Sequence, residues 1–232
     1  MANKDALLTL EDLDLYLLAH RAIRQDLARF SARVPTLRHA AGGTTRAIGM
    51  GEWFERLRAL LEQHHQGEDS WLFPLLVERD PAWASHEAEL AADHHKLDPL
   101  LASAGDRFRA LARAAGPEFD ARRDELASDL LELETLMSGH LEREEAATIP
   151  AMTATVTYRE FMKLERASAK GVPMSTMMLI LPWVMDVADE GQQAKIAGVI
   201  PWPVRMLYRF SWKKKYDRLT SSLAASDLAA TG

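Results

Sequence analysis

The chain has 232 residues, a net charge of −6, 47% hydrophobic residues and 27% charged residues, which is typical of a folded soluble protein. Its overall acidity argues against a nucleic-acid-binding protein. It contains no cysteine, which excludes disulfides, thiolate catalysis and Cys-ligated zinc or iron–sulfur centres. Any metal site must therefore be built from His and carboxylate side chains.

The start of the chain, MANKDALLTLEDLDLYLL, lacks the basic start and apolar core of a signal peptide. The most apolar run is VPMSTMMLILPWVM at 172–185. It is too short for a membrane span and contains Pro173 and Pro182. A cytoplasmic protein is therefore expected.

Apolar residues recur at spacings of three and four along most of residues 1–165, which predicts long helices. The predicted helices are 11–32, 52–78, 84–114 and 118–147. A loop rich in Gly and Thr, TLRHAAGGTTRAIGMG, follows the first, and Asp80-Pro81 and Gly116-Pro117 end the second and third. Pro150 lies near the end of the fourth. The fold class expected for residues 1–165 is all-α, an up-down-up-down four-helix bundle.

Residues 166–232 differ in composition, because Pro and Trp become frequent. We expect a C-terminal extension of two short helices, punctuated by Pro182, Pro201 and Pro203, and a disordered tail, SSLAASDLAATG. The favoured interpretation is a flap that packs on the bundle. The alternative is contact of residues 200–218 with a membrane surface or a partner, because six Lys/Arg face one Asp between Arg205 and Arg218, with aromatic residues interleaved.

One motif occurs twice: a His, a Glu four residues later, and a Pro six residues after the Glu. The two copies are LEQHHQGEDSWLFP (61–74) and MSGHLEREEAATIP (137–150). A coarse internal repeat surrounds them, because His20 and His64 are 44 residues apart and His94 and His140 are 46 apart. Each predicted helix thus carries one His of a repeated arrangement.

Helical register places the four His of this repeat, and the Glu of each motif copy, on the apolar stripes of their helices. In the second helix the stripe is predicted to continue through Trp71 and Leu75. Burying two unpaired carboxylates would cost several kcal/mol each, and no Lys or Arg lies on the stripes at this level. A pair of metal ions is the simplest counter-charge, and a hydrogen-bonded polar core without metal is the alternative. The candidate ligands are His20, His64, Glu68, His94, His140 and Glu144.

The remaining histidines, His39, His65, His86 and His95, are interpreted as loop or surface residues. If the helical register is shifted by one residue, His65 and His95 become the candidate ligands in place of His64 and His94. Tyr16, Asp98 and Glu145 are expected beside the ligands, with Tyr16, Asp69 and Glu145 as candidate proton donors. The catalytic residues themselves are not assigned.

The full pattern, with LFP and TIP after the two Glu motifs, resembles the bacterial hemerythrin-like (HHE) proteins over about residues 11–152. The resemblance implies a bundle that holds two non-haem iron ions. Glu68 and Glu144 would bridge them together with an oxo, hydroxo or water ligand, and the four His would be terminal ligands. Imidazole and carboxylate ligands suit Fe, with Mn as an alternative.

The pattern departs from that of oxygen-carrying hemerythrins, which have a second His where this chain has Asp98 and an Asp where it has Glu145. Four His and two bridging Glu supply about eight of the roughly twelve bonds that two six-coordinate ions form. Open positions favour chemistry on O2, peroxide or NO over reversible oxygen carriage. The resemblance therefore implies a di-iron oxidoreductase of the catalase, peroxidase or oxygenase kind with an unidentified redox partner. The alternative is a non-catalytic iron, oxygen or NO sensor.

Overall fold

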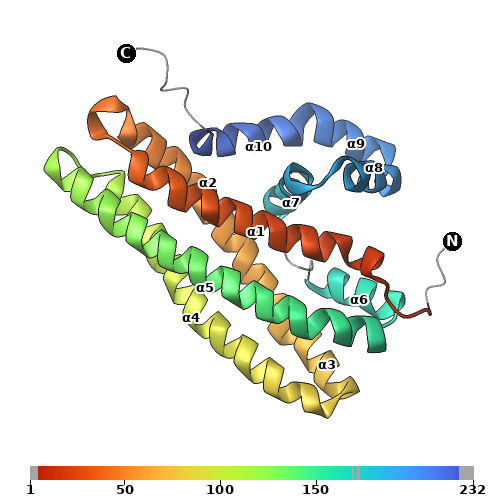
Figure 1. The fold of residues 1–232 in the computed structure, drawn as a ribbon. Coiled ribbons are helices and arrows are strands. Elements are labelled where there is room, and N and C mark those ends of the chain that lie inside the picture. The colour runs from red at the N-terminus through yellow and green to blue at the C-terminus, as the bar shows by residue number, and fades with distance from the viewer. Residues whose placement is uncertain (1–4, 169, 171–172, 225–232) are drawn as a thin grey trace.

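The computed structural model describes residues 5–168, 170 and 173–224, which are almost entirely helical and contain no strand. Four long elements form the predicted up-down-up-down bundle: α1 (Asp14–Arg33), α2 (Gly43–Gly67), α4 (Ala84–Leu111) and α5 (Pro117–Thr155) (Figure 1). Helix α5 packs on both α1 and α4, and α4 packs on α2. The all-α fold class and the C-terminal helical extension are confirmed.

Shorter elements connect and extend the bundle. Within it they are η1 (Leu10–Leu13), η2 (Val34–Thr36), η3 (His39–Ala41), η4 (Glu68–Leu72), α3 (Phe73–Arg79) and η5 (Pro81–Trp83). After it come α6 (Tyr158–Ser168), α7 (Met174–Val187), α8 (Glu190–Val199), α9 (Trp202–Leu207), η6 (Tyr208–Trp212), α10 (Lys213–Thr220) and η7 (Ser221–Leu223). The extension therefore contains more helices than the two expected.

Several predicted boundaries are wrong, and packing explains the differences. Helix α2 begins at Gly43 rather than at 52, because Ala47 and Met50 are fully buried and extend its apolar side into the predicted loop. Helix α5 continues through Pro150 to Thr155, and α7 continues through Pro182. Burial of residues beyond each proline, such as Met152, offsets the lost backbone hydrogen bond.

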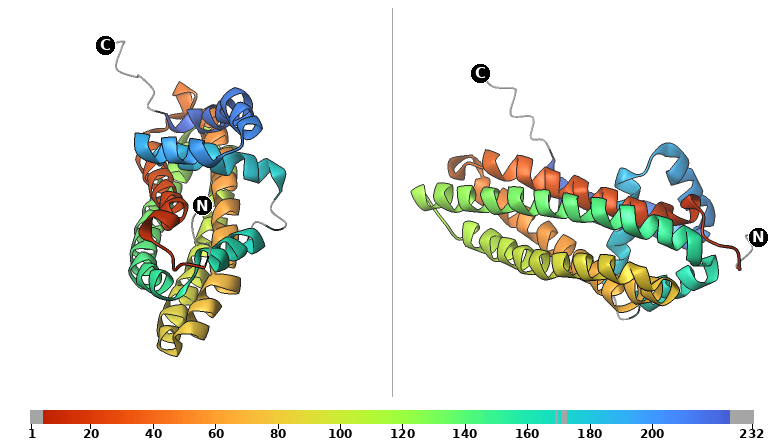
Figure 2. Two further views of the ribbon diagram at one scale, coloured as in Figure 1. Left: turned by 90° about the vertical axis from the view of Figure 1, so that its right-hand side faces the viewer. Right: turned by 60° about the horizontal axis from the view of Figure 1, so that its bottom comes forward.

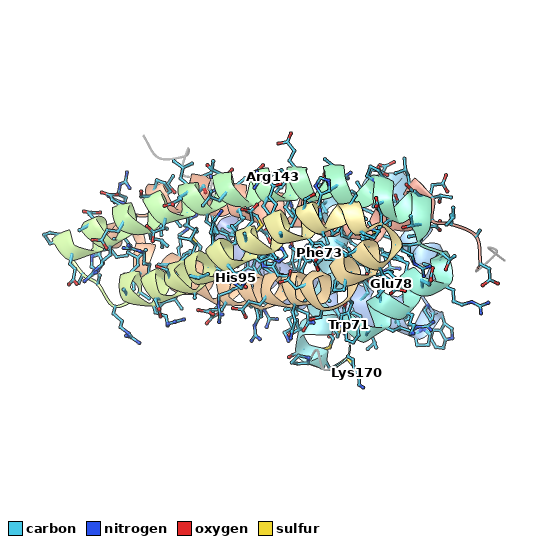
Figure 3. All side chains as sticks on the ribbon, turned by 90° about the horizontal axis from the view of Figure 1, so that it is seen from below. Trp71, Phe73, Glu78, His95, Arg143 and Lys170 are labelled. Carbon is cyan, nitrogen blue, oxygen red and sulfur yellow. The ribbon has the colours of Figure 1, made fainter. Side chains whose placement is uncertain are left out.

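The second helix of the bundle is interrupted by η4, a π-helical turn in which the Phe73 N–H donates to the Glu68 carbonyl. The wider turn shifts the buried face, so that Leu72, Phe73 and Leu76 are buried. Trp71 is 48% exposed, and its predicted place on the apolar stripe is wrong. Figure 3 shows Trp71 at the edge of the bundle and Phe73 between the helices. The π-turn begins at Glu68, one of the candidate ligands.

Two apolar clusters make up the core, one toward each end of the bundle. The larger includes Leu27, Phe54, Leu101 and Leu130, and the smaller includes Leu13, Phe73, Leu90 and Met152. On α2 and α4 the candidate His residues occur between the residues of one cluster and those of the other, and on α1 and α5 His20 and His140 lie at the edge of the larger cluster, beside Leu18 and Leu141. The ligands therefore form a polar layer that is closed by apolar side chains above and below.

The C-terminal extension covers one side of the bundle, with α7 against α1 and α10 against α2 (Figure 2). One buried carboxylate joins helices α1, α2 and α7. Asp26 Oδ2 accepts hydrogen bonds from the indole N–H of Trp53 at 3.0 Å and of Trp183 at 2.9 Å. The ring of Tyr216 packs edge-on against Trp53, 5.3 Å between centroids. Asp26 thus ties α1 to both α2 and α7.

Part of the predicted disordered tail is structured, because Ser221–Leu223 form η7 and Leu223 is buried. Residues 225–232 of that tail lie outside the described residues. Across the part of the chain that the structure describes, no helix has the length and apolar character needed to cross a membrane.

The buried carboxyl of Asp26 predicts a pH-dependent stability. Burial raises its pKa to about 6, against about 3.9 in the unfolded chain. The folded state therefore binds the proton more tightly, and the stability this gives is lost as pH rises from about 4 through about 6. The free energy of unfolding of D26N minus that of wild type should therefore rise by about 2 kcal/mol as the pH is raised from about 4 to about 7. Urea unfolding of both proteins at several pH values measures this difference. A difference that does not change with pH would contradict the raised pKa of Asp26.

Candidate metal centre

Seven side chains from the four bundle elements and η4 converge in the polar layer as two groups. The first group is His20, His64, Glu68 and Glu144, and the second is His65, His94 and His140. In each group, one ligand atom per residue lies within 4.8 Å of the corresponding atoms of the others. All are buried except His64, which is partly buried. The six predicted ligands thus lie together, and a fifth His joins them.

Both carboxylates lie between the imidazoles of the first group and those of the second. Glu68 places Oε1 3.1 Å from His64 Nε2 and Oε2 3.6 Å from His94 Nε2. Glu144 places Oε1 3.5 Å from His20 Nε2 and Oε2 3.3 Å from His140 Nε2. Each carboxylate therefore directs one oxygen toward each group of imidazoles.

Most of the atoms that face this space have no hydrogen-bond partner among the described residues. They are the Nε2 atoms of His20, His64 and His65, both oxygens of Glu68, and Oε2 of Glu144. An unsatisfied buried polar atom costs about 1–3 kcal/mol, and more for a charged group. A hydrogen-bonded polar core would have paired these atoms. The donor set of imidazole and carboxylate lone pairs fits a transition-metal cation, which would satisfy them together.

The opposite ring nitrogens are held by carboxylates. His20 Nδ1 lies 2.9 Å from Glu145, His65 Nδ1 2.7 Å from Asp98 and His94 Nδ1 3.0 Å from Asp69. Such contacts fix the tautomer and orient Nε2 toward the centre. Arg24 in turn donates to Glu145 at 2.7 Å.

A fourth carboxylate of this kind, Asp93, lies 3.6 Å from His140 Nδ1 and also pairs with Arg143. Asp93 is not among the residues that the sequence predicts beside the ligands. Its position next to His94 on a helix with several acidic residues gave no signal that distinguished it from an ordinary surface aspartate. Only the packing of α4 on α5 brings it to His140.

Tyr16 reaches the centre from the other side. Its hydroxyl donates a hydrogen bond to Glu144 Oε1 and lies 3.1 Å from Thr148 Oγ1. Burial, and then the charges of Glu144 and Glu68, hold the pKa of Tyr16 well above its usual value. The phenol is therefore protonated at neutral pH and is positioned beside a candidate ligand.

The electrostatics of the layer favour the neutral form of two imidazoles, those of His64 and His94. Burial, and next the proximity of His20, lower the pKa of His64 well below its usual value. Burial, and next the proximity of His65, lower the pKa of His94 to about 4. Neutral imidazole is the form that offers a lone pair to a metal ion.

The two carboxyl groups shift in opposite directions. Burial, and then the charge of Glu144, raise the pKa of Glu68. For Glu144, burial acts to raise the pKa, but His20 and the other nearby imidazoles hold it well below its usual value. Two carboxylates in one buried site cannot both stay ionised without nearby positive charge.

The interpretation of His65 as a loop or surface residue is wrong. Its side chain is buried and its ring stacks on His94, with centroids 4.1 Å apart and 13° between planes. Adjacent helix positions are about 100° apart, so both His64 and His65 flank the line that points inward. His39, His86 and His95 are exposed, as expected, and Figure 3 shows His95 on α4.

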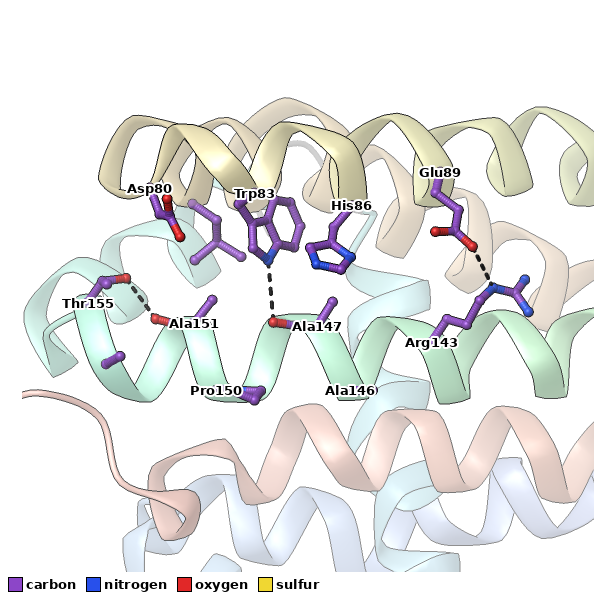
Figure 4. A pocket seen from close by; sticks show the side chains of 12 residues that line it. Asp80, Trp83, His86, Glu89, Arg143, Ala146, Ala147, Pro150, Ala151 and Thr155 are labelled. Atoms are coloured by element: carbon purple, nitrogen blue, oxygen red, sulfur yellow. Dashed lines mark hydrogen bonds and ion pairs between the residues drawn. The ribbon is translucent and has the colours of Figure 1, made fainter.

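A separate groove of about 550 Å³ lies between the start of α4 and the end of α5 (Figure 4). Trp83, His86, Arg143 and Pro150 are among the residues that line it, and Arg143 faces Glu89 across it. None of the seven side chains of the two groups lines this groove. It is therefore distinct from the metal centre.

The fold and this cluster agree with a comparison against protein families. The family model for the hemerythrin HHE cation binding domain matches residues 12–154, which is more than half of the chain. The chain therefore belongs to the hemerythrin HHE family, and its His/Glu cluster is a site for metal binding. No curated protein and no solved structure matches the chain.

The two neighbouring pairs of histidines, His64-His65 and His94-His95, supply a matched test of the ligand set. We expect H65A to lower the metal content per chain by about half, because it removes one of three imidazoles of the second group. H95A changes an exposed residue on α4 and should keep the wild-type metal content. Elemental analysis of the purified proteins measures both. Equal, full metal content in the two variants would remove His65 from the site.

Proposed function

We propose that the cluster binds two iron ions, or manganese in their place, bridged by Glu68 and Glu144. One ion would be held by His20 and His64, and the other by His65, His94 and His140. The observation that supports this is the set of unpartnered lone pairs directed into one space by two carboxylates and the imidazoles around them. Mixed imidazole and carboxylate ligands suit Fe and Mn better than Mg or Ca.

With His65 included, the donors number about nine of the roughly twelve that two six-coordinate ions use. The count exceeds the eight inferred from sequence, and about three positions stay free for other ligands. A bound iron pair supplies these open positions together with a redox couple for O2, peroxide or NO. We propose that the protein acts on peroxide or oxygen as a non-haem di-iron oxidoreductase with an unidentified electron donor.

The protein's own residues supply a proton and a dry environment. Tyr16 holds its proton at the phenolic oxygen, within hydrogen-bond distance of Glu144 Oε1. Apolar clusters on both sides of the layer exclude bulk water and strengthen electrostatic interactions within it. A protonated group beside the ligands suits the breakdown of peroxide, which requires proton transfer.

The first test is the response of the iron-loaded protein to peroxide. We expect close to two irons per chain, visible absorption bands that peroxide changes, and release of oxygen or oxidation of an added donor. A protein with full iron and a spectral response to O2 or NO, but no turnover, would instead be a sensor. Iron-loaded protein that shows no response to any of the three would contradict the proposal.

The role of Tyr16 can be separated from metal binding. Y16F removes the hydroxyl but keeps the ring, so iron content should stay unchanged while kcat for peroxide falls by about 10- to 100-fold. Y158F on α6 is the matched control, because Tyr158 is partly buried in the smaller apolar cluster and touches no candidate ligand in the described contacts. Equal kcat in Y16F, Y158F and wild type would show that Tyr16 carries no proton in the reaction.

A further inference from the structure

The helical run 202–220, formed by α9, η6 and α10, lies outside the family domain at 12–154 and along the outside of the molecule (Figure 1). Its inner row consists of Val204, Tyr208, Trp212 and Tyr216, which are buried or partly buried. The π-turn η6 keeps this row facing the bundle across its whole length. The inner row accounts for the packing of the run, and the outer side has no partner in the described chain.

Large apolar side chains are exposed on the outer side. Trp202, Met206 and Phe210 recur every four residues and are 69%, 45% and 58% exposed. Leu207 lies beside them at 51%, and Val199 precedes the run at 79%. Single exposed apolar residues are ordinary, but a row of them marks an interaction surface.

A second row of Arg205, Arg209 and Lys213 follows the apolar row one position away, and Lys214, Lys215 and Arg218 extend it. The run contains one acidic residue, Asp217, which pairs with Lys213 at 2.8 Å. Within the described residues the other five have no ion-pair partner, whereas Arg24, Arg58, Arg107 and Arg143 of the bundle are all paired with carboxylates. The segment is thus basic in a chain of net charge −6.

We propose that this surface binds an anionic lipid membrane, with the run lying parallel to the membrane plane. Apolar and aromatic side chains would enter the boundary between headgroups and acyl chains, and the adjacent Arg and Lys would meet lipid phosphates. Trp suits this boundary because one end of its ring system is polar. The acidic remainder of the chain is repelled by an anionic surface, so the contact also fixes which side of the molecule faces the membrane.

Lipid fits this surface better than nucleic acid does. A phosphate backbone would use the basic row but would leave Met206, Leu207 and Val199 in water. The composition of residues 166–232 favours a flap over a membrane contact. The two are compatible, because the inner row packs on the bundle while the outer rows stay free.

Co-sedimentation with vesicles tests the proposal on the full-length protein. Wild type should pellet with vesicles of equal parts phosphatidylglycerol and phosphatidylcholine, and about tenfold less with phosphatidylcholine alone. High salt should weaken binding. W202S/F210S and R205S/R209S should each reduce binding about tenfold or more while keeping the wild-type metal content and helicity.

Matched variants on the bundle serve as controls. L131S/L136S removes two exposed leucines of α5, and R56S/R113S removes two exposed arginines; both should bind vesicles as wild type does. Wild type that stays in the supernatant with anionic vesicles would overturn the proposal. Binding to duplex DNA without binding to vesicles would overturn it in favour of a nucleic-acid surface. Equal losses in test and control variants would show that the contact is not specific to this segment.

Discussion

The structure depends on one constraint: a layer of buried lone pairs in the middle of the bundle must be satisfied together. Two carboxylates and five imidazoles face one another with few hydrogen bonds among them. Their cost would be several kcal/mol for each unpaired charged group. The proposed pair of cations, shared by Glu68 and Glu144, would remove this cost on both sides at once. Metal binding at the layer would then be coupled to folding.

The surrounding fold maintains the geometry of this layer. Apolar clusters lie on either side of it, so the four helices are fixed relative to one another just above and below the ligands. Glu145, Asp98 and Asp69 each hold a ring nitrogen on the outer side of the layer. These carboxylates are partly exposed, which places negative charge at the boundary between the centre and solvent. The imidazoles are thereby oriented before a metal ion arrives.

Much of this was predictable from sequence, because helical period and ligand spacing are local properties. The apolar stripes located His20, His94 and the two His-x-x-x-Glu motifs, and the same register brought Tyr16 and Glu145 beside them. The predictions fail at two positions of the second helix. The π-turn adds a residue to one turn and leaves no mark in the apolar periodicity, so Trp71 is exposed where the stripe predicts it buried. His65 precedes the π-turn and is buried because positions 64 and 65 both flank the inward direction of α2.

Other features depend on contacts between distant segments. Asp26 lies on the buried side of α1, but its partners Trp53 and Trp183 are 27 and 157 residues away. Asp93 reaches His140 only through the packing of α4 against α5. The helices of the C-terminal extension are short, and their boundaries depend on the surface of the bundle rather than on their own periodicity.

The proposed centre holds two metal ions in one layer, bridged by two carboxylates. The most direct measurement is anomalous diffraction at the iron absorption edge, from crystals of protein produced with iron and purified without chelator. We expect two anomalous peaks per chain, one within bonding distance of His20 and His64, the other of His65, His94 and His140, with Glu68 and Glu144 between them. A single peak, or peaks outside this layer, would contradict it.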